Sequence, residues 1–132
     1  MKPRVLVVED APDQMLLIRA TLNGDFELAF AATLTEARSE LAAGRTDLVL
    51  LDSNLPDGNG FDFCAELSGQ DRVAAAGDPP VVFLSGLKDA PDRIRAFRAG
   101  ASDYLTKPFH PAELRARVAA RIRRERERFS SA

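Results

Sequence analysis

The run Leu48-Val49-Leu50-Leu51, followed at once by Asp52, decides the fold class. Four consecutive aliphatic residues, rather than an alternating pattern, are typical of a strand that is covered on both faces. Similar apolar runs occupy residues 5–8 and 81–84. We therefore predict that these three segments are central strands of a parallel sheet that lies between two layers of helices.

Two further segments have the patterns of edge strands. Phe26, Leu28 and Phe30 alternate with less apolar residues, and the segment 103–105 is short. Helical apolar spacing and capping signals fill the gaps between the strands. The predicted helices cover residues 12–22, the stretch from the Thr33 cap to Gly44, residues 61–67, residues 91–99 and a segment that begins at Pro111. This alternation predicts a single α/β domain.

Composition excludes several classes of function. The chain has 132 residues, with 18 basic and 20 acidic side chains and a formal charge of -2. It therefore lacks the chain-wide basic field that binds nucleic acid or an anionic membrane, and we expect neither as a direct partner. The sequence has no apolar run of the roughly 20 residues that a bilayer span needs, and no signal-peptide pattern. We expect a cytoplasmic protein.

The C-terminal segment differs in charge from the rest of the chain. Residues 111–132 contain seven arginines and three glutamates. Leu114, Val118 and Ile122 are spaced by four residues, and this apolar stripe stops at Ile122. We expect a packed domain over residues 1–122, and residues 123–132 as a charged helical extension or the start of a linker to an output domain.

Three other features have structural interpretations. The only cysteine, Cys64, is expected to be a small buried side chain on a helix. The only histidine, His110, is expected at the entry to the last helix. The stretch from Ser68 to Pro80 is long for a connection between a helix and a strand. We expect it at the sheet end opposite the strand-end carboxylates, as a contact surface specific to this protein.

Polar side chains gather where the predicted strands end. Glu9 and Asp10 follow the first strand, Asp52 the third, Ser85 the fourth and Lys107 the fifth. The carboxyl ends of parallel strands meet at one edge of the sheet, so these side chains should converge. Each has an ordinary alternative role: a helix cap for Asp10, a turn for Asp52, a loop hydroxyl for Ser85.

Together the carboxylates need a cation. Two carboxylates in close contact repel by up to about 4 kcal/mol at an effective dielectric constant near 20. One lysine does not offset three acids, and hard oxygen ligands suit Mg²⁺.

Four segments in this order give a specific resemblance. They are Val7-Val8-Glu9-Asp10, residues 50–58, residues 84–86 and residues 103–109. From Arg4 to Ile122 the chain resembles the receiver domain of bacterial two-component response regulators. That resemblance implies a flavodoxin-like, doubly wound sheet of five parallel strands in the order 2-1-3-4-5, with helices on both faces.

The resemblance also implies a role for each strand-end residue. Asp52 accepts a phosphoryl group from a histidine kinase or a histidine phosphotransfer protein. Asp10, Asp52 and the backbone carbonyl of Asn54 hold Mg²⁺, and Glu9 acts through bound water. The chain is thus a phosphoacceptor that assists its own phosphorylation and dephosphorylation, rather than a turnover enzyme.

Phosphoryl recognition and switching involve other side chains of the same pattern. The resemblance assigns phosphoryl oxygens to Lys107, to the Ser85 hydroxyl and to backbone N–H groups near Asn54 and Gly86. It implies a cis Lys107–Pro108 bond. It also implies a Tyr104 rotamer that is coupled to Ser85, buried when Asp52 is phosphorylated and outward otherwise. Without the resemblance, Tyr104 is simply an edge-strand packing residue. The expected output surface, and a possible homodimer interface, consists of the fourth helix, the fifth strand and the fifth helix.

Three alternative functions remain to be compared with this hypothesis. Haloacid-dehalogenase-like phosphatases also use a strand-end aspartate and Mg²⁺, but they have a second acid two residues later, where this chain has Asn54. The chain also lacks a cap domain. A degenerate receiver that only binds protein is disfavoured because the key side chains are present. A flavin site would need a phosphate-binding loop after the first strand, and none is present.

Overall fold

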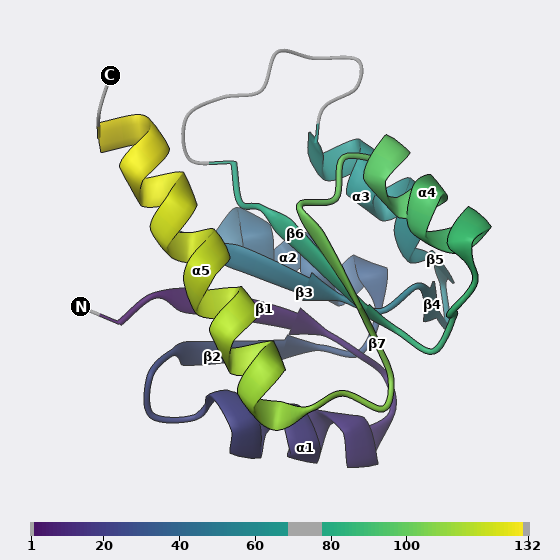
Figure 1. Cartoon of the computed structure of the whole chain (residues 1–132), viewed down its shortest axis with the longest axis horizontal. Helices are drawn as coiled ribbons and strands as arrows, with labels where there is room; N and C mark the ends of the chain where they lie inside the picture. Colours follow the sequence, from purple (N-terminus) through teal and green to yellow (C-terminus); the bar gives the residue numbers. More distant parts are fainter. Residues whose placement is uncertain (1, 69–77, 131–132) are drawn as a thin grey trace.

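A five-stranded parallel sheet is the centre of the computed structural model, which describes residues 2–68 and 78–130 (Figure 1). The spatial order β2-β1-β3-β6-β7 confirms the predicted order 2-1-3-4-5, and it places the two predicted edge strands at the edges. The strands are β1 (Arg4–Val8), β2 (Glu27–Ala31), β3 (Leu48–Leu51), β6 (Val81–Ser85) and β7 (Asp103–Thr106).

Helices cover both faces of this sheet. Helices α1 (Pro12–Leu22) and α5 (Pro111–Ser130) lie on one face, and α2 (Leu34–Ala43), α3 (Gly60–Ser68) and α4 (Ala90–Arg98) lie on the other (Figure 1). A short hairpin of β4 (Asn54–Leu55) and β5 (Gly58–Asn59), which the sequence did not predict, follows β3.

The central strand β3 shows why the apolar runs are continuous. Leu48 and Leu50 contribute to the apolar cluster beneath α1 and α5, whereas Val49 and Leu51 contribute to the cluster beneath α2, α3 and α4. All four side chains are at most 1% exposed. Burial on both faces therefore requires an aliphatic residue at every position of the strand.

The helix starts differ in detail from the expected caps. Ala11 is the cap residue of α1, and it makes no side-chain capping bond, so the alternative role of Asp10 as a helix cap is wrong. At α2, Thr33 Oγ1 accepts a hydrogen bond from the backbone N–H of Glu36, as its spacing predicts. The Glu36 carboxylate accepts from the backbone N–H of Ala32 rather than from that of Thr33.

The last helix continues past the apolar stripe. Ile122 is 4% exposed and packs in the core, as predicted, but α5 runs on to Ser130. The helix therefore continues beyond the last residue of its apolar stripe. The assignment of residues 123–132 to an extension or to a linker stays a prediction. No described helix is both long enough and apolar enough to span a membrane.

Cys64 and His110 have the expected structural positions. Cys64 is fully buried, and burial raises the pKa of its thiol to about 12, which keeps it protonated and unreactive. His110 is exposed and immediately precedes α5, and its carbonyl accepts the hydrogen bond from the N–H of Leu114. Most of the long stretch from Ser68 to Pro80 lies outside the described residues.

Thr46 provides a test of the core. Among the described side chains, its hydroxyl is the buried polar group without a hydrogen-bond partner. We expect Thr46→Val to raise the free energy of unfolding by about 1 kcal/mol, because an unpaired buried hydroxyl is replaced by a methyl group of similar size. Denaturant unfolding measures this change. Thr46→Ser keeps the hydroxyl and should give no gain; equal stability of Thr46→Val and the wild type would contradict the explanation.

Candidate functional site

Three carboxylates meet at the carboxyl edge of the sheet. Glu9 and Asp10 follow β1, and Asp52 follows β3, the neighbouring strand. One carboxylate oxygen from each lies within 4.8 Å of the others. Glu9 is 2% exposed, whereas Asp10 is on the surface and Asp52 is half-buried. The structure therefore brings together the acidic residues that the sequence placed at the strand ends.

Lys107 brings the one nearby ammonium group among the described residues to this cluster. Its Nζ donates to Glu9 Oε1 and lies 3.5 Å from Asp52 Oδ2. The Lys107 backbone N–H donates to the carbonyl oxygen of Ser85 at 2.8 Å, which ties the end of β7 to the end of β6. The Lys107–Pro108 peptide bond is cis, as predicted.

The electrostatics of the cluster favour a bound cation. Burial raises the pKa of Glu9, the Asp52 charge raises it further, and the hydrogen bond from Lys107 acts in the opposite direction. Glu9 Oε2 also accepts hydrogen bonds from the backbone N–H groups of Asp10 and Ala11. Three carboxylates against one ammonium group formally leave two negative charges without a partner. Oxygen ligands in this arrangement suit a hard divalent cation.

Gly60 holds the acidic cluster in position, a role that the sequence analysis missed. A Cβ at this position would lie 2.2 Å from the carbonyl oxygen of Asp52. The Gly60 N–H donates to the carbonyl oxygen of Ser53 at 2.8 Å. The first residue of α3 thus packs directly on the backbone that carries Asp52. The available signal was a glycine at the start of a helix, where a capping side chain is usual.

Ser53 was also missed, although it directly follows the same strand as Asp52. Its side chain is buried, and its Oγ lies 2.6 Å from Ser85 Oγ. The Ser53 backbone N–H donates to Asp52 Oδ1 at 2.8 Å. Ser85 is fully buried at the end of β6, and its Oγ accepts from the N–H of Leu87 at 3.0 Å. The rule that strand-end side chains converge applies equally to Ser53.

Tyr104 is buried in this structure. It is 8% exposed, its ring stacks on Phe83 with centroids 5.8 Å apart, and its hydroxyl donates to the Leu87 carbonyl at 2.7 Å. Burial raises the pKa of the phenol, and a hydrogen bond from Ser85 partly opposes that shift. The packing interpretation of Tyr104 agrees with this position. The coupling of its rotamer to Ser85 stays a prediction.

Other loop residues lie around the cluster. Asn54 is exposed in β4, and an added Cβ at the exposed Gly86 would meet no atom within 4 Å. The expected roles of their backbone groups stay predictions. Asp57 was missed: its carboxylate accepts from the N–H groups of Leu34 and Thr35 at 2.8 and 3.0 Å, which ties the β4–β5 hairpin to the start of α2.

Comparison with known proteins places this geometry in a family. Residues 5–119 match the family model described as the response regulator receiver domain. The DNA-binding response regulator MtrA of Mycolicibacterium smegmatis is 38% identical over 128 residues, which are 96% of this chain and 54% of that protein. The chain thus spans about half the length of the curated relatives that it matches.

Solved structures agree with this match. The BeF3-activated N-terminal receiver domain of Klebsiella pneumoniae RstA is 34% identical with a TM-score of 0.79, over 91% of this chain and 98% of that one. A CheY-like receiver domain protein from Methanospirillum hungatei has a TM-score of 0.85 over 97% of this chain and 99% of that one. At 20% identity, the second comparison shows the fold alone.

The contact between Gly60 and Asp52 can be tested by substitution. We expect Gly60→Ala to lower the free energy of unfolding by about 2 kcal/mol, because the new Cβ must displace the Asp52 backbone. Denaturant unfolding measures the loss. Gly44→Ala is the matched control, since Gly44 has an extended φ of 173° and a Cβ there would meet no atom within 4 Å. Equal losses in both variants would contradict this explanation.

The raised pKa of Glu9 gives a second prediction. In the folded protein this pKa lies above the unfolded value, so the ionised carboxylate opposes folding at pH 7, and the penalty disappears as the pH falls below the unfolded value. We expect Glu9→Gln to raise the thermal midpoint at pH 7 in a chelating buffer, and to reduce the dependence of the midpoint on pH. A lower midpoint for Glu9→Gln than for wild type would mean that its ion pair with Lys107 outweighs the cost of burial.

Proposed function

The chain belongs to the response regulator receiver domain family, and on this premise we propose that it is a phosphorylation-controlled signalling switch whose phosphoacceptor is Asp52. One observation carries the proposal: the Asp52 carboxylate lies within an acidic cluster and 3.5 Å from the Lys107 ammonium group. The proposed donor is the phosphohistidine of a histidine kinase or a histidine phosphotransfer protein, and the proposed location is the cytoplasm.

Transfer requires a carboxylate that the phosphoryl donor can reach, and neutralisation of charge. An Asp52 oxygen attacks phosphorus, the new O–P bond forms as the P–N bond to the donor histidine breaks, and the electron pair leaves with the imidazole. Lys107 pairs with one phosphoryl oxygen, and the Ser85 hydroxyl donates to another. Backbone N–H groups near Asn54 and Gly86 complete the proposed contacts. In-line phosphoryl transfer depends mainly on such positioning and charge neutralisation.

The donor set fits Mg²⁺. Asp10, Asp52 and the backbone carbonyl of Asn54 would hold the ion, with Glu9 acting through water, and these are the oxygen ligands that Mg²⁺ prefers. When bound, the ion neutralises charge on the phosphoryl oxygens. The chain's own contribution is a fixed position for Glu9, whose carboxylate is held by Lys107 and by two backbone N–H groups.

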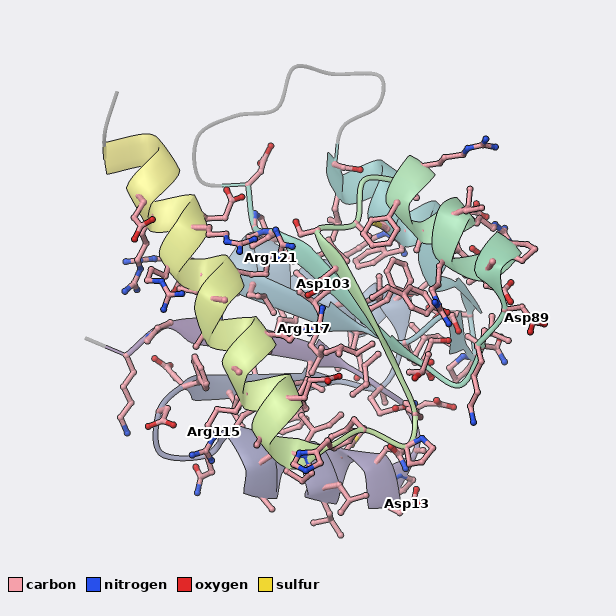
Figure 2. The ribbon with its side chains drawn as sticks, in the orientation of Figure 1. Asp13, Asp89, Asp103, Arg115, Arg117 and Arg121 are labelled. Atoms are coloured by element: carbon pink, nitrogen blue, oxygen red, sulfur yellow. The ribbon has the colours of Figure 1, made fainter. Side chains whose placement is uncertain are left out.

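The proposed output surface consists of α4, β7 and α5. Tyr104 of β7 reaches the loop before α4 through its hydrogen bond to the carbonyl of Leu87. Ile94 and Phe97 of α4 are 50% and 49% exposed, which is unusual for large apolar side chains. Figure 2 shows Asp103 of β7 beside Arg117 of α5, and their ion pair measures 3.1 Å. We propose that this surface binds a second copy or a target when Tyr104 is held inward.

Phosphorylation of Asp52 can be tested directly. We expect the wild type to form one acyl phosphate with acetyl phosphate and Mg²⁺, and Asp52→Ala to form none, as measured by intact-protein mass. Asp89→Ala is the matched control, because Asp89 is an exposed aspartate that makes no side-chain capping bond to α4. Undiminished labelling of Asp52→Ala would exclude Asp52 as the acceptor, and sustained turnover of several phosphate esters would favour the hydrolase instead.

A further inference from the structure

The β4–β5 hairpin carries Asn54, whose backbone carbonyl is a proposed ligand of Mg²⁺. Each strand of the hairpin has two residues, and Asn54 pairs with Asn59. A two-stranded ribbon is marginally stable on its own in water. The position of the Asn54 carbonyl therefore depends on the contacts that hold the hairpin to the rest of the domain.

The base of the hairpin is fixed to the start of α3. Asn59 Oδ1 accepts a hydrogen bond from the backbone N–H of Asp62 at 2.8 Å, and Asn59 Nδ2 donates to the Asp62 carboxylate at 2.9 Å. The N–H of Gly60 donates to the carbonyl oxygen of Ser53 at 2.8 Å. These contacts hold the two ends of the hairpin, whereas the turn needs a separate anchor.

The turn is held by the start of α2. The Asp57 carboxylate accepts from the backbone N–H groups of Leu34 and Thr35 at 2.8 and 3.0 Å, and from the Thr35 hydroxyl at 2.9 Å. The hydrogen bond from Leu34, followed by those from Thr35, lowers the pKa of Asp57. A Cβ at Gly58 would lie 2.9 Å from Leu34 Cδ1, so the turn packs directly on this helix.

Two side chains share the capping of α2, and one of them belongs to the hairpin. The first N–H groups of a helix have no partner within the helix. Asp57 accepts from those of Leu34 and Thr35, and Thr33 Oγ1 accepts from that of Glu36 at 3.1 Å. Loss of either cap weakens the start of α2. Loss of Asp57 also releases the turn of the hairpin, so the two residues form a matched pair for a test.

We propose that Asp57 is a positioning residue that fixes the hairpin to α2 and so holds the backbone carbonyl of Asn54 in place for Mg²⁺. This inference rests on the proposed function, because it takes Asn54 as a ligand of the ion. It goes beyond that function because it assigns control of metal affinity to a residue outside the acidic cluster. A site that is correctly formed for only part of the time binds its ligand more weakly by that fraction.

A titration with MgCl₂, followed by the NMR shift of the Asp10 amide, tests this role. We expect Asp57→Ala to bind Mg²⁺ about tenfold more weakly than the wild type, which is the lower end of the cost of losing a residue that orients a metal ligand. Asp57→Asn keeps one acceptor oxygen and should lose less. Thr33→Ala, which removes the other cap of α2, should bind like the wild type.

A control for charge is needed because Asp57→Ala also removes a negative charge. Asp13→Asn removes an exposed carboxylate from the first turn of α1 and should leave the affinity unchanged. All titrations are made in about 0.5 M KCl, where interactions between distant surface charges are largely screened.

Backbone ¹⁵N relaxation without Mg²⁺ provides a readout that does not depend on the metal. We expect lower order parameters for residues 54–59 in Asp57→Ala, and wild-type values in Thr33→Ala. Leu55 is 6% exposed and packs in the core cluster beneath α2, so the variant should have a looser turn and remain folded.

The outcomes distinguish this inference from the proposed function. Unchanged Mg²⁺ affinity in Asp57→Ala, while the wild type binds, would overturn the role of Asp57 and leave the metal site in place. Equal weakening in Thr33→Ala would also overturn it, because the effect would then come from the stability of α2. Equal weakening in Asp13→Asn would assign the effect to charge alone. Absence of Mg²⁺ binding by the wild type would contradict the proposed metal site together with this inference.

Discussion

The contact of the Lys107 ammonium group with Glu9 and Asp52 is the interaction on which the site depends. Three carboxylates at one sheet edge repel one another, and this ammonium group is their one close cationic partner among the described side chains. The strand order makes the contact possible. β1 and β3 are neighbours at the centre, and Lys107 is anchored to the end of β6 by its hydrogen bond to the Ser85 carbonyl.

The sheet and the acidic cluster could be predicted because both follow from local patterns. A strand buried on both faces requires a continuous aliphatic run, and the residue after the run is then placed at the functional edge. The strand-end rule places Ser53 at this edge, but the specific contacts of Ser53 and Gly60 could not be predicted in this way. The partner of Ser53 is 32 residues away, and the requirement at Gly60 comes from the backbone of Asp52 in a different segment. Such contacts exist only once the chain has folded.

The end of α5 shows a second limit of sequence patterns. The last residue of the apolar stripe, Ile122, is buried, but the helix continues to Ser130. Arginine and glutamate between positions 121 and 128 are good helix formers, and several are spaced by four residues, so the helix needs no core contact to persist. Apolar periodicity predicts which part of a helix is buried. It does not predict the residue at which the helix ends.

The ionised Glu9 carboxylate destabilises the folded protein. Burial and the Asp52 charge raise the pKa of Glu9, so ionised Glu9 is less stable here than in the unfolded chain. A bound cation brings the opposite charge to this edge. A ligand that binds only the folded form stabilises that form by an amount that grows with the logarithm of its concentration above Kd.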